Sequence, residues 1–130
     1  MSGDVEAVVR DAFRALAEGG VEAMLPYVHE EFVMITPPEL ASEPDTYRGP
    51  AGVQRWFDSF YEAMDEVRIE PHELRTYGDD LVGIAFRMVA RGRTTSLELI
   101  QEACARCEVL EGEIRRITFF ATWEELEETL

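Results

Sequence analysis

Two cysteines in a C-x-x-C spacing, Cys104 and Cys107, are the first candidates for chemistry in this chain. Such a pair can bind zinc or form a redox disulfide, but a zinc site needs four ligands, and only His29 and His72 could complete one. The pair also lies within a strand pattern, which directs its two side chains to opposite faces. We therefore expect reduced structural thiols in a cytoplasmic protein, no metal site, and both histidines at the surface.

Charged residues on two long predicted strands, 81–91 and 97–109, are the second candidate. They are Arg87, Arg91, Glu98, Glu102 and Arg106. Pointing inward, they could form an acid–base site. Strand alternation favours the opposite arrangement, in which the charges form cross-strand pairs outside and the inward residues are Phe86, Met88, Ala103, Ala105, Cys107 and Val109. A register shift of one residue would reverse this, so both arrangements stay open.

The helices that must position these strands are predicted from apolar spacing. Two lie before residue 29 and are separated by Gly19-Gly20, the second carrying Val28 on its apolar side. The strongest begins at Pro50 and carries one bulky face, made of Val53, Trp56, Phe57, Phe60, Tyr61 and Met64. That face either fills a core or lines a ligand cavity, and the spacing is compatible with both.

The remaining pattern is one of strands and turns. A short strand, 32–36, ends at two prolines, and 38–47 is the longest predicted loop. After Met64 the period changes to two, and Pro71 with a change of parity predicts an edge strand or a bulge. Glu111-Gly112 predicts a tight hairpin, and Thr122 with Glu125 predicts a capped final helix. Helices first and strands later predict an α+β domain.

Length and charge limit the function. The chain has 130 residues, which suits one domain over 1–130. It carries 27 acidic residues against 12 basic ones, all arginine, for a net charge of −15. Such a surface repels phosphate, which argues against nucleic acids and anionic membranes as partners. Neither a membrane-spanning apolar run nor a secretion leader is expected from the pattern.

Several motifs resemble the nuclear-transport-factor-two-like superfamily, and within it the SnoaL-like domains. They are VEAVVRDAFRALAEGG, EEFVMITPPE, TYRGPAGVQRWF, GDDLVGIAFRMVARGR and LEGEIRRITFF. The resemblance implies a cone-shaped, curved antiparallel sheet wrapped around helices, a cystatin-like α+β barrel, with a pocket inside. It also implies a homodimer through the outer sheet face. It implies no single activity, because this fold serves isomerases, cyclases and binding proteins alike.

The ketosteroid isomerases of this superfamily use a carboxylate base, a tyrosine and a second acid. By resemblance these roles fall on Thr36, on Ala12 beside Phe13, and near Ala105 or Gln101. None of the three positions holds the required group, so isomerase chemistry of that kind is not expected.

We therefore predict a SnoaL-like protein that binds a small hydrophobic or aromatic ligand without metal or organic cofactor. The alternatives are an acid–base enzyme of the cyclase, isomerase or hydratase type and a non-catalytic partner-binding module. The residues expected to line the pocket are Phe13, Met34, Thr36, Tyr47, Trp56, Phe60, Phe86, Met88, Gln101 and Phe119.

Overall fold

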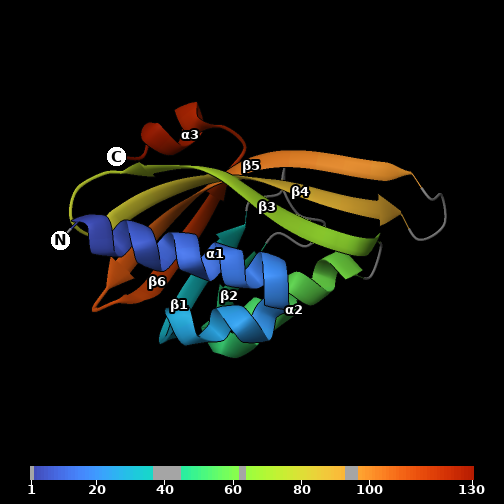
Figure 1. Ribbon diagram of the computed structural model, residues 1–130, viewed down its shortest axis with the longest axis horizontal. Helices are drawn as coiled ribbons and strands as arrows, with labels where there is room; N and C mark the ends of the chain where they lie inside the picture. The colour runs from blue at the N-terminus through green and yellow to red at the C-terminus, as the bar shows by residue number, and fades with distance from the viewer. Residues whose placement is uncertain (1, 37–44, 62–63, 93–96) are drawn as a thin grey trace.

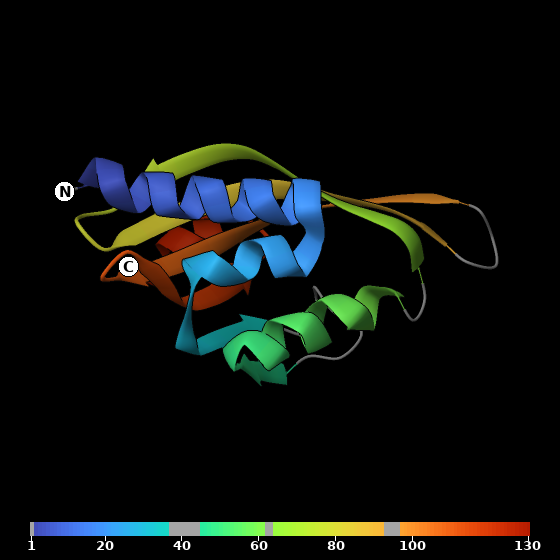
Figure 2. The same ribbon diagram turned by 60° about the horizontal axis from the view of Figure 1, so that its bottom comes forward.

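A curved sheet with two helices on one face and a short helix on the other makes up the fold (Figures 1 and 2). The computed structural model describes residues 2–36, 45–61, 64–92 and 97–130. In chain order the elements are α1 (Ser2–Met24), the 3₁₀ turn η1 (Leu25–Tyr27), β1 (Val28–Thr36), β2 (Asp45–Arg48), α2 (Gly49–Tyr61), β3 (Met64–Thr76), β4 (Leu81–Gly92), β5 (Glu98–Leu110), β6 (Glu113–Phe120) and α3 (Trp123–Glu127). The predicted α+β class is confirmed.

The six strands run in the order β2-β1-β6-β5-β4-β3. Neighbouring strands are antiparallel except β1 and β6, which are parallel. The sheet is therefore mixed, where an antiparallel one was predicted, and it stays open with β2 and β3 at its edges. The parallel pair brings β1, from the first part of the chain, beside the last strand, β6.

Gly20 bends α1 into two helical segments. Its φ of 78° and ψ of −167° lie where glycine is favoured, which confirms the predicted break at Gly19-Gly20. The second segment ends at Met24, and Val28 begins β1, although its spacing placed it on the helix. Pro26 gives the reason, because a proline cannot continue an α-helix through its own position.

A short strand, β2, was not predicted. It pairs with β1 through Met34 opposite Tyr47 and Ile35 opposite Thr46. The last residues of the predicted loop 38–47 therefore belong to a strand. Residues 38–44 of that loop lie outside the described part of the chain. The sequence Asp-Thr-Tyr-Arg shows no apolar alternation that would reveal a strand. Downstream, α2 begins as predicted, but Met64 belongs to β3 and not to the helix.

Strand alternation in the centre of the sheet is as predicted. Phe86, Met88 and Ala103 are buried in the main core, whereas Arg87 and Glu102 are exposed on the other face. The cysteines follow the same rule: Cys107 lies in the main core and Cys104 beneath α3, both as free thiols.

The edge and turn predictions are also confirmed. β3 is an edge strand whose register shifts between Pro71 and Glu73. Glu111 and Gly112 both have positive φ, 53° and 82°, as a tight hairpin turn with this twist requires. At α3 the hydroxyl of Thr122 accepts a hydrogen bond from the amide of Glu125, whose carboxylate accepts one from the amide of Ala121.

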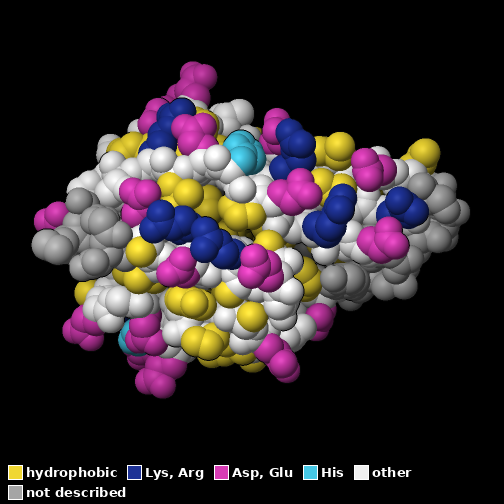
Figure 3. Space-filling model, viewed as in Figure 1, with side chains coloured by type: hydrophobic (Ala, Val, Ile, Leu, Met, Phe, Trp, Pro, Cys, Tyr) yellow, Lys and Arg dark blue, Asp and Glu magenta, His cyan; other side chains and the backbone are white. Residues whose placement is uncertain are grey.

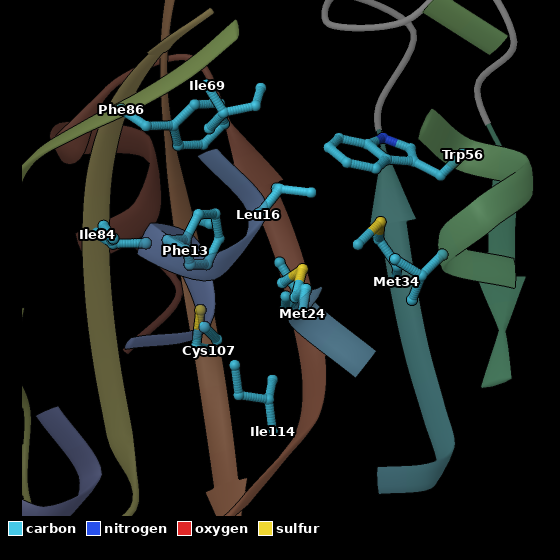
Figure 4. Close-up of a cluster of buried hydrophobic side chains, with 14 of the residues drawn as sticks. Phe13, Leu16, Met24, Met34, Trp56, Ile69, Ile84, Phe86, Cys107 and Ile114 are labelled. Atoms are coloured by element: carbon cyan, nitrogen blue, oxygen red, sulfur yellow. The ribbon is translucent and has the colours of Figure 1, made fainter. Parts of the chain in front are cut away.

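The main core lies between α1, α2 and the concave face of the sheet. Figure 4 shows Phe13, Leu16 and Met24 from α1 and its second segment opposite Ile84, Phe86 and Cys107 of the central strands. Among the described residues, none of the helices is long and apolar enough to cross a membrane.

Candidate functional site

A small cavity lies between α2 and the concave face of the sheet. Its volume is about 20 Å³, room for a group the size of one water molecule. The described residues that line it are Thr36, Trp56, Phe86, Met88, Gln101, Ala103 and Phe119. They come from α2 and from β1, β4, β5 and β6, so elements distant in sequence enclose one space.

Aromatic rings form much of the wall. Trp56 and Phe119 stack with their ring centroids 5.3 Å apart and their planes inclined by 10°. Phe86 meets Phe119 edge to face at 5.8 Å. In Figure 4 the indole of Trp56 reaches from α2 across the concave face toward the strands that carry Ile69 and Phe86. This arrangement leaves an apolar space between the rings and the sheet.

Thr36 supplies a polar group in this wall. It is the last residue of β1, on the same face of the strand as the buried Phe32 and Met34, and is 5% exposed. Its Oγ1 is buried and has no hydrogen-bond partner among the described residues. A buried hydroxyl without a partner costs free energy, which a ligand that hydrogen-bonds to it would recover.

The other lining residues add no titratable side chain. Gln101, partly exposed, contributes an amide that can donate and accept hydrogen bonds. Of the described residues around the cavity, none is an Asp, Glu, His, Cys, Lys or Arg. The cavity can therefore admit a small uncharged group, but its described wall offers no general base.

Four other residues expected to line the pocket lie elsewhere or cannot be placed there. Phe13 and Met34 are buried in the core, Phe13 with its ring 5.9 Å from that of Phe86. Tyr47 is buried on β2 beneath the guanidinium of Arg55, which lies 4.7 Å from its ring centroid. The side chain of Phe60 lies outside the described part of the structure.

Ala103 lines the cavity and was not among the expected residues. It lies directly opposite Phe86 on the neighbouring strand. The inward parity predicted for β5 already contained this position. Its small side chain was the missed signal, because an alanine between bulky neighbours leaves space unfilled.

The charged residues considered for an acid–base site lie on the outer face. Arg87 and Glu102 are paired at 3.2 Å, with their side chains 46% and 63% exposed. Arg91 pairs with Glu66 at 3.5 Å, and Arg106 donates to Thr129 at the end of the chain. On the side shown in Figure 3, arginine side chains lie among acidic ones without forming a separate basic patch. These groups do not face the cavity.

Neither histidine belongs to the cavity. His29 lies near the start of β1, where its Nδ1 accepts a hydrogen bond from the amide of Glu31, and His72 is exposed on the edge strand. His29 is thus a strand residue and is partly exposed. Among the described residues, no group of three His, Cys, Asp or Glu side chains is arranged to hold a metal ion.

Shifted pKa values occur around α3, on the opposite side of the sheet from the cavity. Glu127 accepts hydrogen bonds from the hydroxyl of Tyr77 at 2.6 Å and from Arg75 at 3.2 Å, and both bonds lower its pKa. Burial and the bond to Glu127 raise the pKa of Tyr77. Burial also raises the pKa of Cys104 to about 11, so this thiol stays protonated at neutral pH.

The open curved sheet, the helices in its concave side and the small apolar cavity between them define a nuclear-transport-factor-two-like fold. Solved structures of this class match nearly the whole chain. A nuclear-transport-factor-two-like protein of Burkholderia thailandensis aligns with a TM-score of 0.80 and 18% identity over 95% of both chains. TerC, co-crystallised with polyporic acid, aligns with a TM-score of 0.79 and 13% identity over 96% of both. A candidate polyketide cyclase of Xanthomonas campestris pv. campestris aligns with a TM-score of 0.75 and 17% identity, over 96% of this chain and 95% of the other.

The family follows from the sequence itself. The SnoaL-like domain matches residues 9–117, and the chain belongs to that family. No curated protein matches the sequence. At these identities the solved structures establish the fold, and the activity has to be argued from the cavity.

Proposed function

We propose that this SnoaL-like protein binds a small, neutral, mainly apolar or aromatic molecule at the cavity beside Trp56 and Phe119, with only an end group about the size of one water molecule inside it. The observation that carries the proposal is the buried hydroxyl of Thr36, which lacks a partner among the described residues and borders an aromatic wall. A ligand with one hydrogen-bonding group would satisfy that hydroxyl while its carbon atoms replace water at the rings.

The charge of the surroundings supports a neutral ligand. The described wall of the cavity holds no cation that could pair with a buried anion, and an unpaired buried charge is costly. It holds no carboxylate to pair with a cation either. Binding by position and hydrogen bonding, without metal or organic cofactor, accounts for the wall better than acid–base catalysis does.

We further propose, from the resemblance, a cytoplasmic homodimer that uses the outer face of the sheet. Support comes from α3, which packs over Ala85 and Cys104 and leaves the outer face around Arg87 and Glu102 open to solvent. The net charge of −15 argues against nucleic acids as partners.

Thr36→Val tests the proposed binding site, because valine has the shape of threonine without its hydroxyl. The probe is 1-octanol, a neutral molecule with one hydroxyl, titrated by NMR. Loss of one neutral hydrogen bond, worth about 0.5–1.5 kcal/mol, should weaken binding about three- to tenfold.

Thr118→Val is the matched control for this experiment. Its hydroxyl is also buried without a partner among the described residues, but Thr118 does not line the cavity. Both substitutions should raise stability in urea, because each removes an unsatisfied hydroxyl. Only Thr36→Val should weaken binding. Equal affinity in the two variants would refute the proposed site.

A further inference from the structure

A second hollow adjoins the cavity on the β4–β5 hairpin, and we call it the outer groove. It measures about 320 Å³, within the range of small-molecule sites. The described residues lining it are Met88, Ala90, Leu99, Ile100 and Gln101. Met88 and Gln101 also line the inner cavity, so the two spaces share a wall.

Strand register explains why the two spaces are continuous. Phe86 lies opposite Ala103, Met88 opposite Gln101, and Ala90 opposite Leu99. These three pairs alternate onto the same face of the hairpin, one after another. The first pair lies in the cavity and the last in the outer groove, a distance of about 13 Å along the strands. Figures 1 and 2 show the hairpin extending beyond the end of α1.

The contrast in size between the spaces limits the ligand. The inner cavity holds a group about the size of one water molecule, whereas the outer groove is many times larger. A ligand that reaches Thr36 can therefore place only a small end group inside. Its body must lie past Met88 and Gln101, whose unbranched side chains can change rotamer to let it through.

The outer groove is built for an apolar body. Leu99, opposite Ala90 and on the same face as Met88 and Gln101, is 45% exposed. Covering it with a hydrocarbon removes apolar area from water. The described residues of both spaces carry no charge, which favours an uncharged ligand throughout.

We infer that the outer groove is the second compartment of one ligand site, and that the ligand class is an elongated neutral amphiphile with a single small hydrogen-bonding end, such as a medium-chain alcohol. The inference rests on the proposed function, since the polar end is placed at Thr36. The chain lies over Ala90 and Leu99. A fatty acid of equal length binds more weakly at neutral pH, because its carboxylate would be buried without a cation.

Chain length provides the test. NMR titrations with 1-butanol, 1-hexanol and 1-octanol should show affinity rising by about fourfold for each added methylene, as burial of hydrocarbon in the outer groove requires. Octanoate should bind more weakly than 1-octanol. Affinity that stays level from 1-butanol to 1-octanol would overturn the inference, because the outer groove would then take no part.

Leu99→Gln isolates the outer groove, with Leu110→Gln as its matched control. Both leucines lie on β5 and are 45% exposed, but Leu110 is at the opposite end of the strand. Leu99→Gln should weaken 1-octanol about tenfold and leave 1-butanol unchanged, whereas Leu110→Gln should change neither. Equal effects of the two substitutions on 1-octanol would overturn the inference.

The result with Thr36→Val separates this inference from the proposed function. If Thr36→Val weakens every alcohol and Leu99→Gln weakens none, the inner site stands and the outer groove is refuted. If Leu99→Gln alone weakens 1-octanol, the proposed contact with Thr36 is refuted, and so is the inference that places the polar end there. Sedimentation of both variants tests whether the groove is instead a contact between copies of this chain. If Leu99→Gln converts a dimer to a monomer and leaves alcohol binding unchanged, the inference is overturned and the groove is such a contact.

Discussion

Gly83 on β4 should be required for the docking of α3. A β-carbon added there would lie 2.6 Å from Cζ3 of Trp123 and 3.1 Å from Cε2 of Tyr77. Carbon atoms in contact normally lie about 3.5–4.0 Å apart, so Gly83→Ala forces the indole away from the sheet. Trp123 packs against the cluster of Ala85, Cys104 and Leu126, and the displacement therefore disturbs the contact between α3 and the outer face.

Two opposing terms set the size of the effect. Forcing an extra carbon into a packed contact costs about 1–3 kcal/mol. Replacing glycine by alanine restores about 0.4–1 kcal/mol by restricting the unfolded chain. The net expectation for Gly83→Ala is a loss of about 1–2 kcal/mol. For a domain of this size that lowers the melting temperature by about 4–8 °C.

Thermal unfolding followed by circular dichroism measures this loss, and a double-mutant cycle with Trp123→Ala identifies its cause. With the indole removed, the added β-carbon meets no ring atom of residue 123. Gly83→Ala should then cost much less in the Trp123→Ala background than in the native chain. Additive losses would refute the steric explanation and place the effect within the strand itself.

Two further predictions concern charged groups on the outer face. Because Glu127 has a lowered pKa in the folded state, its contribution to stability is present above its ordinary pKa of 4.5 and is lost as the pH falls through the lowered value. Tyr77, with a raised pKa, contributes below its ordinary pKa of 10.0 and loses that contribution as the pH rises further. Melting temperatures across this range should show both losses, and Glu127→Gln should abolish the acid one. Arg87→Ala breaks the exposed ion pair with Glu102. The substitution should lower the free energy of unfolding in urea by at most about 1 kcal/mol and leave 1-octanol binding unchanged. Weaker binding would mean that this ion pair contributes to the ligand site.

Much of the fold could be predicted because its signals are local and repeated. The alternation of Phe86 and Met88 with Arg87 correctly assigned the faces of β4, and Pro71 correctly marked an edge strand with a bulge. What failed depends on partners distant in sequence. β2 exists because β1 lies beside it, and the parallel pairing of β1 with β6 has no local signature.

The cavity residues also divide into those that local sequence signals predict and those that depend on distant neighbours. Trp56 was expected from the apolar face of α2, and Thr36 from the resemblance, which places the isomerase base at its position; both border the cavity. Ala103 was predicted to face inward, but its small side chain marks a cavity only once its neighbour Phe86 on the next strand is known. Met34 and Tyr47 were expected in the wall; they lie opposite each other on β1 and β2, buried in the main core, and are not among the described lining residues. Parity predicts which face a side chain occupies, but not how deep it lies in the core.

Position 36 decides which chemistry this cavity can support. A carboxylate placed there would be enclosed by Trp56 and Phe119, and burial would raise its pKa toward the range in which a general base operates. The threonine found there avoids the cost of a buried charge and leaves an unsatisfied hydroxyl in its place. Under the proposed function, the surroundings that would activate an acid at this position make the hydroxyl a selective anchor instead, because they favour a neutral ligand that can complete its hydrogen bond and disfavour a charged one.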